Sequence, residues 1–369
     1  MKPENKKERK TEKYSREQEI KNTRKMREIL EDLPRFCRQY FRGIEERTSA
    51  RTRLAYAYDL RVFFEFLMRE NPALKGMEIR DYPLSVLEKI GKEDIEEYLE
   101  YLTCYEKDGQ TVTNDARGKA KKLSAVRSLF KYYYTAEVLQ RDVTALVPLP
   151  RLHEKPIIRL NTEEVAQMLD QADSGAELSE KQRSFHEKTR YRDVAMLILL
   201  LGTGIRVSEC VGLDLDDIDF REKGIRVHRK GGYDSIVYFG DEVETALREY
   251  LEHREQILPK EGHEKALFLS LQNRRITVRA VENLVKKYAS LTTSLKKITP
   301  HKLRSTYGTS LYRATGDIYL VADVLGHKDV NTTRKHYAAI EEDRRKSARN
   351  IVRLRKETSV SEDGNEENT

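Results

Sequence analysis

The sequence predicts a mainly α-helical protein with one small β-sheet, folded as two domains. The first observation is length, because 369 residues can bury two separate hydrophobic cores. The second is VPLPRLHEKP at residues 147–156, whose three prolines cannot continue a helix. The third is periodicity, since most apolar residues recur at helical spacing and only a short stretch near residue 230 alternates as strands do.

The charge and cysteine content narrow the class of protein. Lys and Arg outnumber Asp and Glu by 69 to 62, which gives a formal net charge of +7 and permits a polyanionic partner. The three cysteines are far apart and form no CxxC pair, so neither a disulfide framework nor structural zinc is expected. The longest apolar run, residues 194–201, is too short to span a membrane, and no secretory signal is present. We therefore expect a cytoplasmic protein without a membrane partner.

The two ends of the chain carry opposite charge. Residues 1–28 are dominated by Lys and Arg, whereas residues 356–369 are mostly acidic. Neither end shows apolar periodicity, so residues 1–31 and 356–369 are predicted to be disordered tails. The basic tail is also a candidate for contact with a nucleic-acid backbone.

Residues 32–146 are predicted to form a helical domain. Apolar residues three and four apart mark the buried face of two of its helices: Tyr56, Leu60, Phe63 and Leu67, then Leu123, Val126, Phe130 and Tyr133. One basic amphipathic helix is usually only a solvated helix, but two in one small domain favour contact with nucleic acid. The candidate residues for this contact are Arg51, Arg53, Arg61, Lys119, Lys122 and Arg127.

A linker over residues 147–157 is predicted to lead into a second domain over residues 158–355. The first helix of that domain starts at Asn161, which can cap it and is followed by two acidic residues in the first turn. Residues 174–190 are charged and without pattern, and we expect a loop there.

The β-sheet is expected within this second domain. Residues 224–229 (GIRVHR) and 235–239 (SIVYF) alternate and are rich in β-branched side chains, and the glycines between them permit a tight turn. This pattern predicts a hairpin with Lys230 at its tip. Residues 266–270 (ALFLS) predict another short strand.

Four segments of the second domain carry side chains that suit a phosphate. In TGIRVSE, Arg206 opens a helix whose free N–H groups attract anions, although an ion pair with Glu209 is an alternative. In HKLR, His301 and Arg304 are three residues apart and share one helical face. Lys230, on a turn, would ordinarily be only solvated.

The fourth segment is LGHKDVNTTRKHY, which brings His327, His336 and Tyr337 close to basic residues. Three imidazoles, those of His301, His327 and His336, could in principle hold zinc. No carboxylate or cysteine joins them at ligand spacing, so no metal is expected. No nucleotide-binding glycine motif is present either, and no cofactor is expected.

The ordered set TGIRVSE, RKGG, HKLR and LGHKDVNTTRKHY resembles the tyrosine recombinase (phage integrase, Xer-type) family, and the resemblance covers nearly the whole chain. It implies a helical N-terminal core-binding domain and an α+β catalytic domain. It also implies six catalytic residues: Arg206 and Arg304 as the phosphate clamp, Lys230 as the general acid, His301 and His327 as partners of the phosphate or of the tyrosine, and Tyr337 as the nucleophile.

The function implied by this resemblance is site-specific DNA recombination. The phenol would attack a phosphate and form a 3′-phosphotyrosyl ester, without metal or ATP, because arginines supply the charge and the ester conserves the bond. The implied partners are double-stranded DNA with a specific recombination site and three further copies of the chain, in a tetramer on two duplexes. The segment after Tyr337 would dock on an adjacent subunit or on its own domain.

Three departures from the family pattern stand out. Ser305 replaces a second histidine after the arginine, Arg229 replaces the common glycine before the lysine, and Tyr337 lies ten residues after His327, as in some branches only. None of them removes a proposed catalytic group. Two other functions stay open, namely strand relaxation of the type IB topoisomerase kind and a non-catalytic DNA-binding accessory role.

Overall fold

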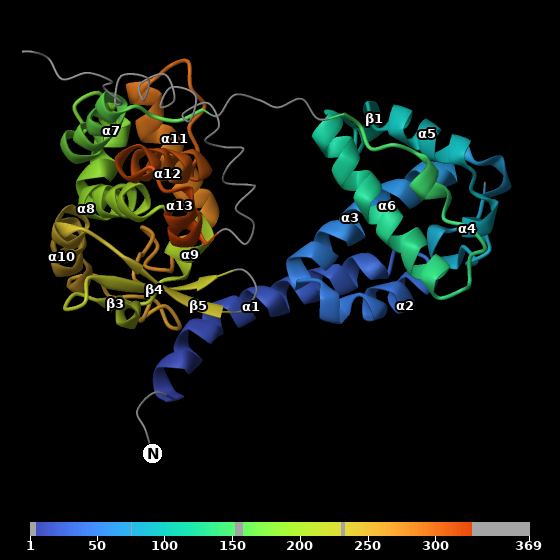
Figure 1. Cartoon of the computed structure of the whole chain (residues 1–369), viewed down its shortest axis with the longest axis horizontal. Helices are drawn as coiled ribbons and strands as arrows, with labels where there is room; N and C mark the ends of the chain where they lie inside the picture. Colours follow the sequence, from blue (N-terminus) through green and yellow to red (C-terminus); the bar gives the residue numbers. More distant parts are fainter. Residues whose placement is uncertain (1–4, 75, 152–157, 230–232, 327–369) are drawn as a thin grey trace, which may run out of the picture. The chain divides into compact units, whose positions relative to one another are not determined.

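The computed structural model describes residues 5–74, 76–151, 158–229 and 233–326. The chain divides into two compact units, Met1–Lys155 and Pro156–Thr369, which are coloured blue to green and green to red in Figure 1. The fold class predicted from the sequence is confirmed, because both units are mainly helical and the sheets are small and antiparallel. No helix in the described ranges has the length and apolar character needed to cross a bilayer.

The first unit is a helical bundle with one added hairpin. Its helices are α1 (Asn5–Leu30), α2 (Phe36–Gly43), α3 (Ala50–Glu70), α4 (Val86–Lys89), α5 (Lys92–Tyr101) and α6 (Ala116–Thr135). The hairpin, which the sequence did not predict, pairs β1 (Cys104–Lys107) with β2 (Gln110–Thr113). Short 3-10 helices connect these elements: Glu45–Arg47, Pro72–Leu74, Ile79–Asp81 and Val143–Leu146.

Helices α3 and α6 form the centre of this unit, and their predicted apolar faces are confirmed. Ser49 and Asp115 cap the two helices by accepting hydrogen bonds from main-chain N–H groups three residues later. Almost every residue of the two predicted stripes is buried, and Phe63 meets Tyr98 of α5 edge to face at 5.0 Å between ring centroids. Aromatic packing of this kind holds α2, α3, α5 and α6 together.

The prediction of a disordered tail over residues 1–31 is wrong for residues 5–30, which form α1. The C-terminal part of α1 packs on α3, and Met26, Ile29 and Leu30 are buried there. These three residues are spaced as one helical face. The stripe is short and follows a long charged segment, so the sequence pattern alone does not reveal it. Residues 1–4 lie outside the described part of the chain.

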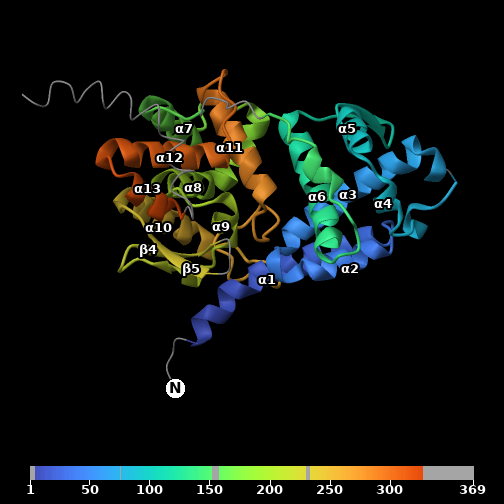
Figure 2. The same ribbon diagram turned by 45° about the vertical axis from the view of Figure 1, so that its right-hand side comes forward.

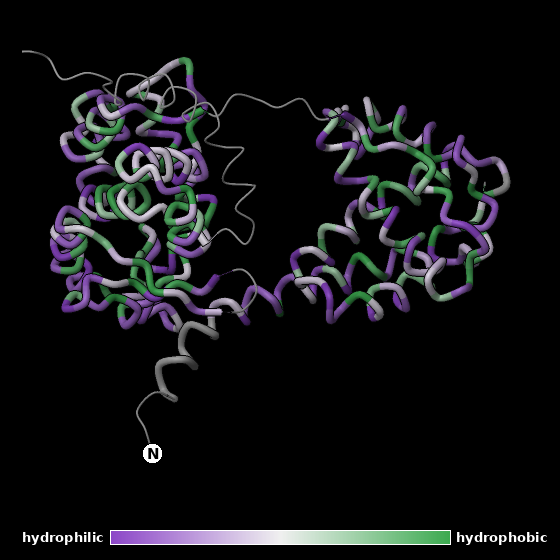
Figure 3. Tube along the Cα trace, in the orientation of Figure 1, coloured by the Kyte–Doolittle hydropathy of each residue, from purple (hydrophilic) through white to green (hydrophobic). Residues whose placement is uncertain are grey.

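The second unit is built around helix α8, whose apolar C-terminal half is green in Figure 3. Its helices are α7 (Thr162–Ser174), α8 (Glu180–Thr203), α9 (Val207–Gly212), α10 (Asp241–Glu255), α11 (Val278–Thr292), α12 (Pro300–Thr315) and α13 (Ile318–Leu325). Helix α8 contacts α7, α10 and α12, so it lies at the centre of this unit (Figure 2). The predicted cap of α7 is confirmed, because Asn161 and Glu164 accept hydrogen bonds from each other's main-chain N–H.

Two local predictions in this unit are wrong. The expected loop over residues 174–190 is instead the end of α7, a short turn and the first half of α8, which Ser179 caps together with Gln182. The buried ring of His186 supports this half by bonding to Ala172 O at 2.8 Å. Residues 266–270 form no strand; they make only the isolated bridges of Ala266 and Leu269.

The hairpin predicted in the second unit is confirmed. The sheet has the order β3 (Ile218–Asp219), β4 (Gly224–Arg229), β5 (Tyr233–Tyr238), and all neighbours are antiparallel. The register pairs Gly224 with Tyr238 and Arg229 with Tyr233, and the predicted tip residue Lys230 lies outside the described residues. Alternation along β4 buries Ile225, Val227 and Arg229, so an arginine occupies a position on the core side of the strand.

Candidate active site

Arg206 is held at the start of α9 by a glutamate one turn further on. Gly204 caps the C-terminal end of α8 with a left-handed φ of +63°, and an added Cβ there would overlap the ring of Tyr307. The main-chain N–H and the Nη1 of Arg206 donate to the two carboxylate oxygens of Glu209 at 2.8 and 2.7 Å, and Nη2 donates to Gly326 O at 3.3 Å. Glu209 is buried whereas 34% of the Arg206 side chain is exposed, so the ion pair orients the guanidinium and leaves it accessible.

Arg304 connects three helices from a buried position on α12. Its Nη1 donates to Gly204 O at 2.6 Å, and its Nη2 donates to Leu325 O. His301 lies one turn earlier on α12 and is exposed. The hydroxyl of Ser305, which replaces the second histidine of the family pattern, donates to His301 O at 3.1 Å within the same helix. The start of α12 therefore carries an exposed histidine and, one turn later, a buried arginine.

Three arginines converge on the C-terminal end of α13. The last carbonyls of a helix lack partners within it and carry the negative end of its dipole, so cations are favourable there. The acceptors are consecutive residues: Arg229 donates to Val324 O at 2.9 Å, Arg304 to Leu325 O and Arg206 to Gly326 O. Side chains from β4, α9 and α12 thus meet at the residues that directly precede His327.

The structure describes half of the six catalytic residues predicted from the sequence. Arg206, His301 and Arg304 lie in described elements, and two of them meet at the end of α13. The other three, Lys230, His327 and Tyr337, lie outside the described residues. Among the described residues, no group of three or more His, Cys, Asp or Glu side chains is placed to hold a metal ion.

Sequence reasoning missed two residues of this site. The sequence offers Glu209 as an ion-pair partner that is an alternative to phosphate binding by Arg206, but its three-residue spacing also signals that it could orient that arginine. Arg229 stands out in the sequence only as a departure from the family pattern. The alternation of strand β4 places Arg229 on the same side as Ile225 and Val227, and that was the signal that it would be buried.

Tyrosines near the site differ in how accessible they are. Tyr307 is packed on Gly204, and burial raises the pKa of its phenol, which makes it a poor source of phenolate. Tyr312 is buried at 4% exposure. Tyr319, on α13, is 71% exposed and is the natural control for the proposed nucleophile.

In the first unit the structure assigns Arg53 a different role from the one predicted. Arg53 is buried and donates to the carbonyls of Glu45 and Thr48 at 2.9 and 2.5 Å, and it pairs with the Glu45 carboxylate at 3.2 Å. These bonds tie the start of α3 to the preceding turn. Arg53 is therefore removed from the candidates for contact with nucleic acid.

The remaining candidates of the first unit lie at or near its surface. Arg51 is exposed, and Arg61 lies 3.7 Å from the Glu65 carboxylate. Burial lowers the pKa of the Lys122 ammonium group, although the charge of Asp59 acts in the opposite direction. The three candidate residues on α6 each bind within the unit: Lys119 to Thr103, Lys122 to Asn114 and Arg127 to Val147 O.

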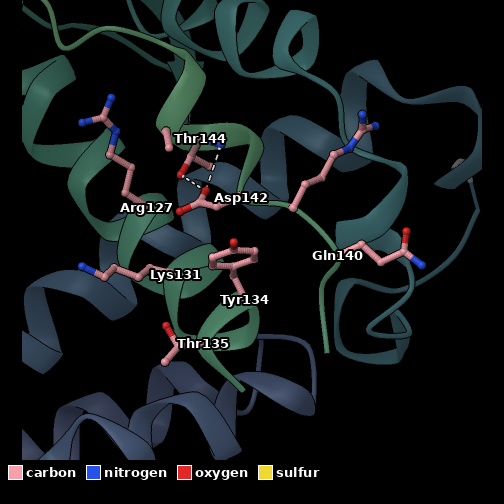
Figure 4. A pocket seen from close by; sticks show the side chains of 9 residues that line it. Arg127, Lys131, Tyr134, Thr135, Gln140, Asp142 and Thr144 are labelled. Atoms are coloured by element: carbon pink, nitrogen blue, oxygen red, sulfur yellow. Dashed lines mark hydrogen bonds between the residues drawn. The ribbon is translucent and has the colours of Figure 1, made fainter. Parts of the chain in front are cut away.

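A basic hollow of about 580 Å³ opens beside α6 (Figure 4). Its cationic side chains are Arg127, Lys131 and Arg141, and the half-exposed ring of Tyr134 lies among them. Asp142, the acidic residue of the hollow, accepts hydrogen bonds from the main chain and hydroxyl of Thr144. Three cations beside an aromatic ring suit a nucleic-acid backbone.

Comparison with known proteins defines the class of protein to which this fold and site belong. Residues 158–344 match the model of the phage integrase family, and this match covers just over half of the chain. The chain belongs to the phage integrase family.

The relatives with curated names make the class more specific. Tyrosine recombinase XerC of Caldanaerobacter subterraneus subsp. tengcongensis is 33% identical over 306 residues, which cover 80% of this chain and 79% of the relative. Tyrosine recombinase XerS of Lactococcus lactis subsp. cremoris is 32% identical over 360 residues, which cover 89% of this chain and 98% of the relative. The protein is therefore a tyrosine-type site-specific recombinase, as the sequence resemblance predicted.

Solved structures agree on the fold. The XerH site-specific recombinase bound to palindromic difH substrate in a post-cleavage complex matches 82% of this chain and 80% of its own, with a TM-score of 0.60 and 22% identity. The Tn1549 transposon integrase in complex with circular intermediate DNA matches 84% of this chain and 98% of its own, with a TM-score of 0.61 and 20% identity.

Proposed function

We propose that the protein cuts and rejoins duplex DNA at a specific recombination site through a 3′-phosphotyrosyl ester. The observation that carries the proposal is the convergence of Arg206 and Arg304 at the end of α13, immediately before His327 in the chain. In this proposal the unit that spans Pro156–Thr369 is catalytic and the unit that spans Met1–Lys155 binds the DNA core site.

The two guanidiniums supply the charge that the reaction needs. A scissile phosphate gains negative charge as a nucleophile attacks, and planar guanidinium forks bond two of its oxygens at once, which lysines do less well. Arg206 has the exposure to reach such a phosphate, and Glu209 holds its orientation before DNA arrives. Preorganised donors of this kind each contribute roughly 2.7–4 kcal/mol to transition-state stabilisation.

The remaining roles follow from the chemistry of strand exchange. The Oη of Tyr337 forms a bond to phosphorus as the bond from phosphorus to the 5′-oxygen breaks. His301 takes the phenolic proton, and Lys230 gives a proton to the departing 5′-oxygen, so that a 5′-hydroxyl results. His327 bonds the same phosphate or orients the tyrosine. Attack on the ester by the 5′-hydroxyl of another strand reverses these steps and requires neither metal nor nucleotide.

The proposed partners are double-stranded DNA and further copies of the chain. The XerH and Tn1549 integrase structures that share this fold hold DNA substrates. The basic hollow of the first unit, with Lys131 and Arg141, is the proposed contact for the DNA backbone there. We further propose a homotetramer on two duplexes, in which residues after Tyr337 dock on an adjacent subunit.

The test is to trap the covalent complex on fragmented genomic DNA and to sequence the attached ends. The expected result is one short sequence joined through its 3′-phosphate, and Tyr337→Phe should bind the same DNA without forming the adduct. Tyr319→Phe is the matched control and should form adducts at the normal rate, because Tyr319 is an exposed phenol of the same unit. If Tyr337→Phe still forms adducts on a nicked suicide substrate, the assignment of the nucleophile is wrong. Relaxed circles without recombinant products would indicate topoisomerase activity instead.

A further inference from the structure

Arg229 is a buried cation next in sequence to the proposed general acid. It is the last described residue of β4, it is 3% exposed, and it shares the core side of that strand with Ile225 and Val227. A buried position on a strand ordinarily holds an apolar side chain. The arginine therefore needs a specific explanation.

The guanidinium of Arg229 is locked onto the end of α13. Its Nη2 donates to Val324 O at 2.9 Å. Gly326, which ends α13 with a φ of +60°, lies directly against the same guanidinium: an added Cβ would overlap Nη1 and would lie 2.6 Å from Cζ. The contact thus needs a long planar cation on β4 and a glycine at residue 326.

The described residues leave part of the same guanidinium without a hydrogen-bond partner. Its Nε and Nη1 are buried and donate no hydrogen bond within the described ranges. Arg275, whose side chain is 12% exposed, by comparison pairs with the Asp214 carboxylate. Burying a cation with unused donors costs stability, and an apolar side chain of similar volume would be at least as favourable for folding alone. Stability therefore does not account for Arg229.

The position of Arg229 in the chain suggests a reason for its presence. Lys230 follows it directly, and His327 directly follows Gly326, so the Arg229 contact joins the two chain segments that lead into these proposed catalytic residues. Arg206 and Arg304 bind the next two carbonyls of the same helix end. One contact can therefore set the hairpin and the end of α13 at a fixed distance from the phosphate clamp.

We infer that Arg229 is a positioning residue, which fixes the end of β4 to the end of α13 and thereby fixes the point from which the chain continues to Lys230. The inference rests on the proposed function, in which Lys230 protonates the departing 5′-oxygen. Small displacements are costly in such a role, because a shift of about 1 Å in a catalytic group can lower a rate about 10²-fold.

The experiment compares two leaving groups at the scissile phosphate. The substrate is a synthetic duplex of the sequence recovered by covalent trapping, either unmodified or with sulfur in place of the bridging 5′-oxygen. A thiolate departs without a proton, so the sulfur substrate bypasses the general acid. The variant is Arg229→Met, which keeps the length of the side chain and removes the cation. Arg254→Met is the matched control. Arg254 lies on α10, is similarly buried, and also donates to main-chain carbonyls, those of Glu264 and Ala266.

Arg229→Met is expected to cleave the unmodified duplex about 10²-fold more slowly than the native protein and the sulfur duplex at nearly the native rate. Lys230→Ala should show the same rescue, and adding Arg229→Met to it should cause no further loss on the unmodified duplex. Arg254→Met should change the cleavage rate of both duplexes by the same factor. An unchanged rate, or an equal loss on both duplexes, for Arg229→Met would overturn the inference. Failure of rescue for Lys230→Ala would instead show that the general acid of the proposed function is wrong, and the inference would fall with it.

A second measurement tests the contact without DNA. Amide hydrogen exchange of the free protein should quicken in β4, β5 and the end of α13 in Arg229→Met, and stay unchanged in α10. Arg229→Lys provides the same test if the methionine variant does not fold, because lysine lacks the planar fork that spans Val324 O and Gly326. Native protection of β4 and α13 in a folded variant would contradict the proposed lock.

Discussion

Buried arginines serve different purposes in the two units of this recombinase. Arg53 in the first unit binds the carbonyls of Glu45 and Thr48, which precede it by eight and five residues. Arg304 in the second unit binds the carbonyls of Gly204 and Leu325, which lie 100 and 21 residues away. An arginine with local partners secures the start of one helix. An arginine with remote partners brings several elements to one point, and only that arrangement can assemble a site.

The largest effect is expected from a substitution of Arg304, the buried arginine of the second unit. Arg304→Lys keeps the charge but cannot bond Gly204 O and Leu325 O with one planar fork. We expect the cleavage rate to fall about 10²–10³-fold while the protein still binds DNA. The control is Arg53→Lys, which should lower the free energy of unfolding by about 1 kcal/mol and leave the cleavage rate unchanged. Equal losses of cleavage in the two variants would show that the range of the contacts does not distinguish the two arginines.

A somewhat smaller effect is expected from Glu209→Gln. The amide keeps the shape of the side chain but loses the charge that orients Arg206, and its NH₂ group cannot accept a hydrogen bond. Single-turnover cleavage should slow roughly 10- to 100-fold, in line with the cost of a small misplacement of a catalytic group. Glu282→Gln is a fair control, because Glu282 meets Arg279 at the same spacing in a far more exposed pair of the second unit. A normal rate for Glu209→Gln would mean that Arg206 needs no help from Glu209.

Gly326→Ala tests how closely the side chain of Arg229 packs against the end of α13. The left-handed φ and the overlap of an added Cβ with Arg229 should lower the free energy of unfolding by about 1–3 kcal/mol. Gly240→Ala should cost less than about 1 kcal/mol, because Gly240 has a negative φ and open space around its Cα. Chemical denaturation of both variants provides the measurement, and similar costs would argue against close packing at Gly326.

The smallest effect is expected in the hollow of the first unit. Lys131→Ala should weaken DNA binding by a similar factor on all sequences and reduce the slope of log K against log salt by about 1. The cleavage rate at saturating DNA should not change, because Lys131 belongs to the first unit. Lys89→Ala, on α4 of the same unit, is the control for a general loss of charge. A change in cleavage rate with unchanged affinity would place Lys131 in the chemistry rather than in DNA binding.

Much of the fold follows from short-range pattern in the sequence. The stripe that includes Leu123 and Phe130 predicted α6, Asn161 predicted the start of α7, and the alternation around Val227 predicted the hairpin of the second unit. These features depend on neighbours within a few residues, so the sequence displays them directly. Apolar periodicity did not predict the helices in which charged residues predominate, namely α1 and the first half of α8. There, contacts with distant elements, such as that of Met26 with the core, stabilise helices that have little apolar periodicity of their own.

The order and type of residues alone determined the family, and they also selected the two arginines that are proposed to bind the phosphate, because catalytic groups keep their order along a chain. Only the tertiary structure decided which arginines share a location. Arg53 carries the same charge as Arg304 but is used locally, while Arg229, which had no predicted role, joins the site. The physical reason is that each contact at the end of α13 spans between 21 and 120 residues of chain, so it exists only once the elements have packed.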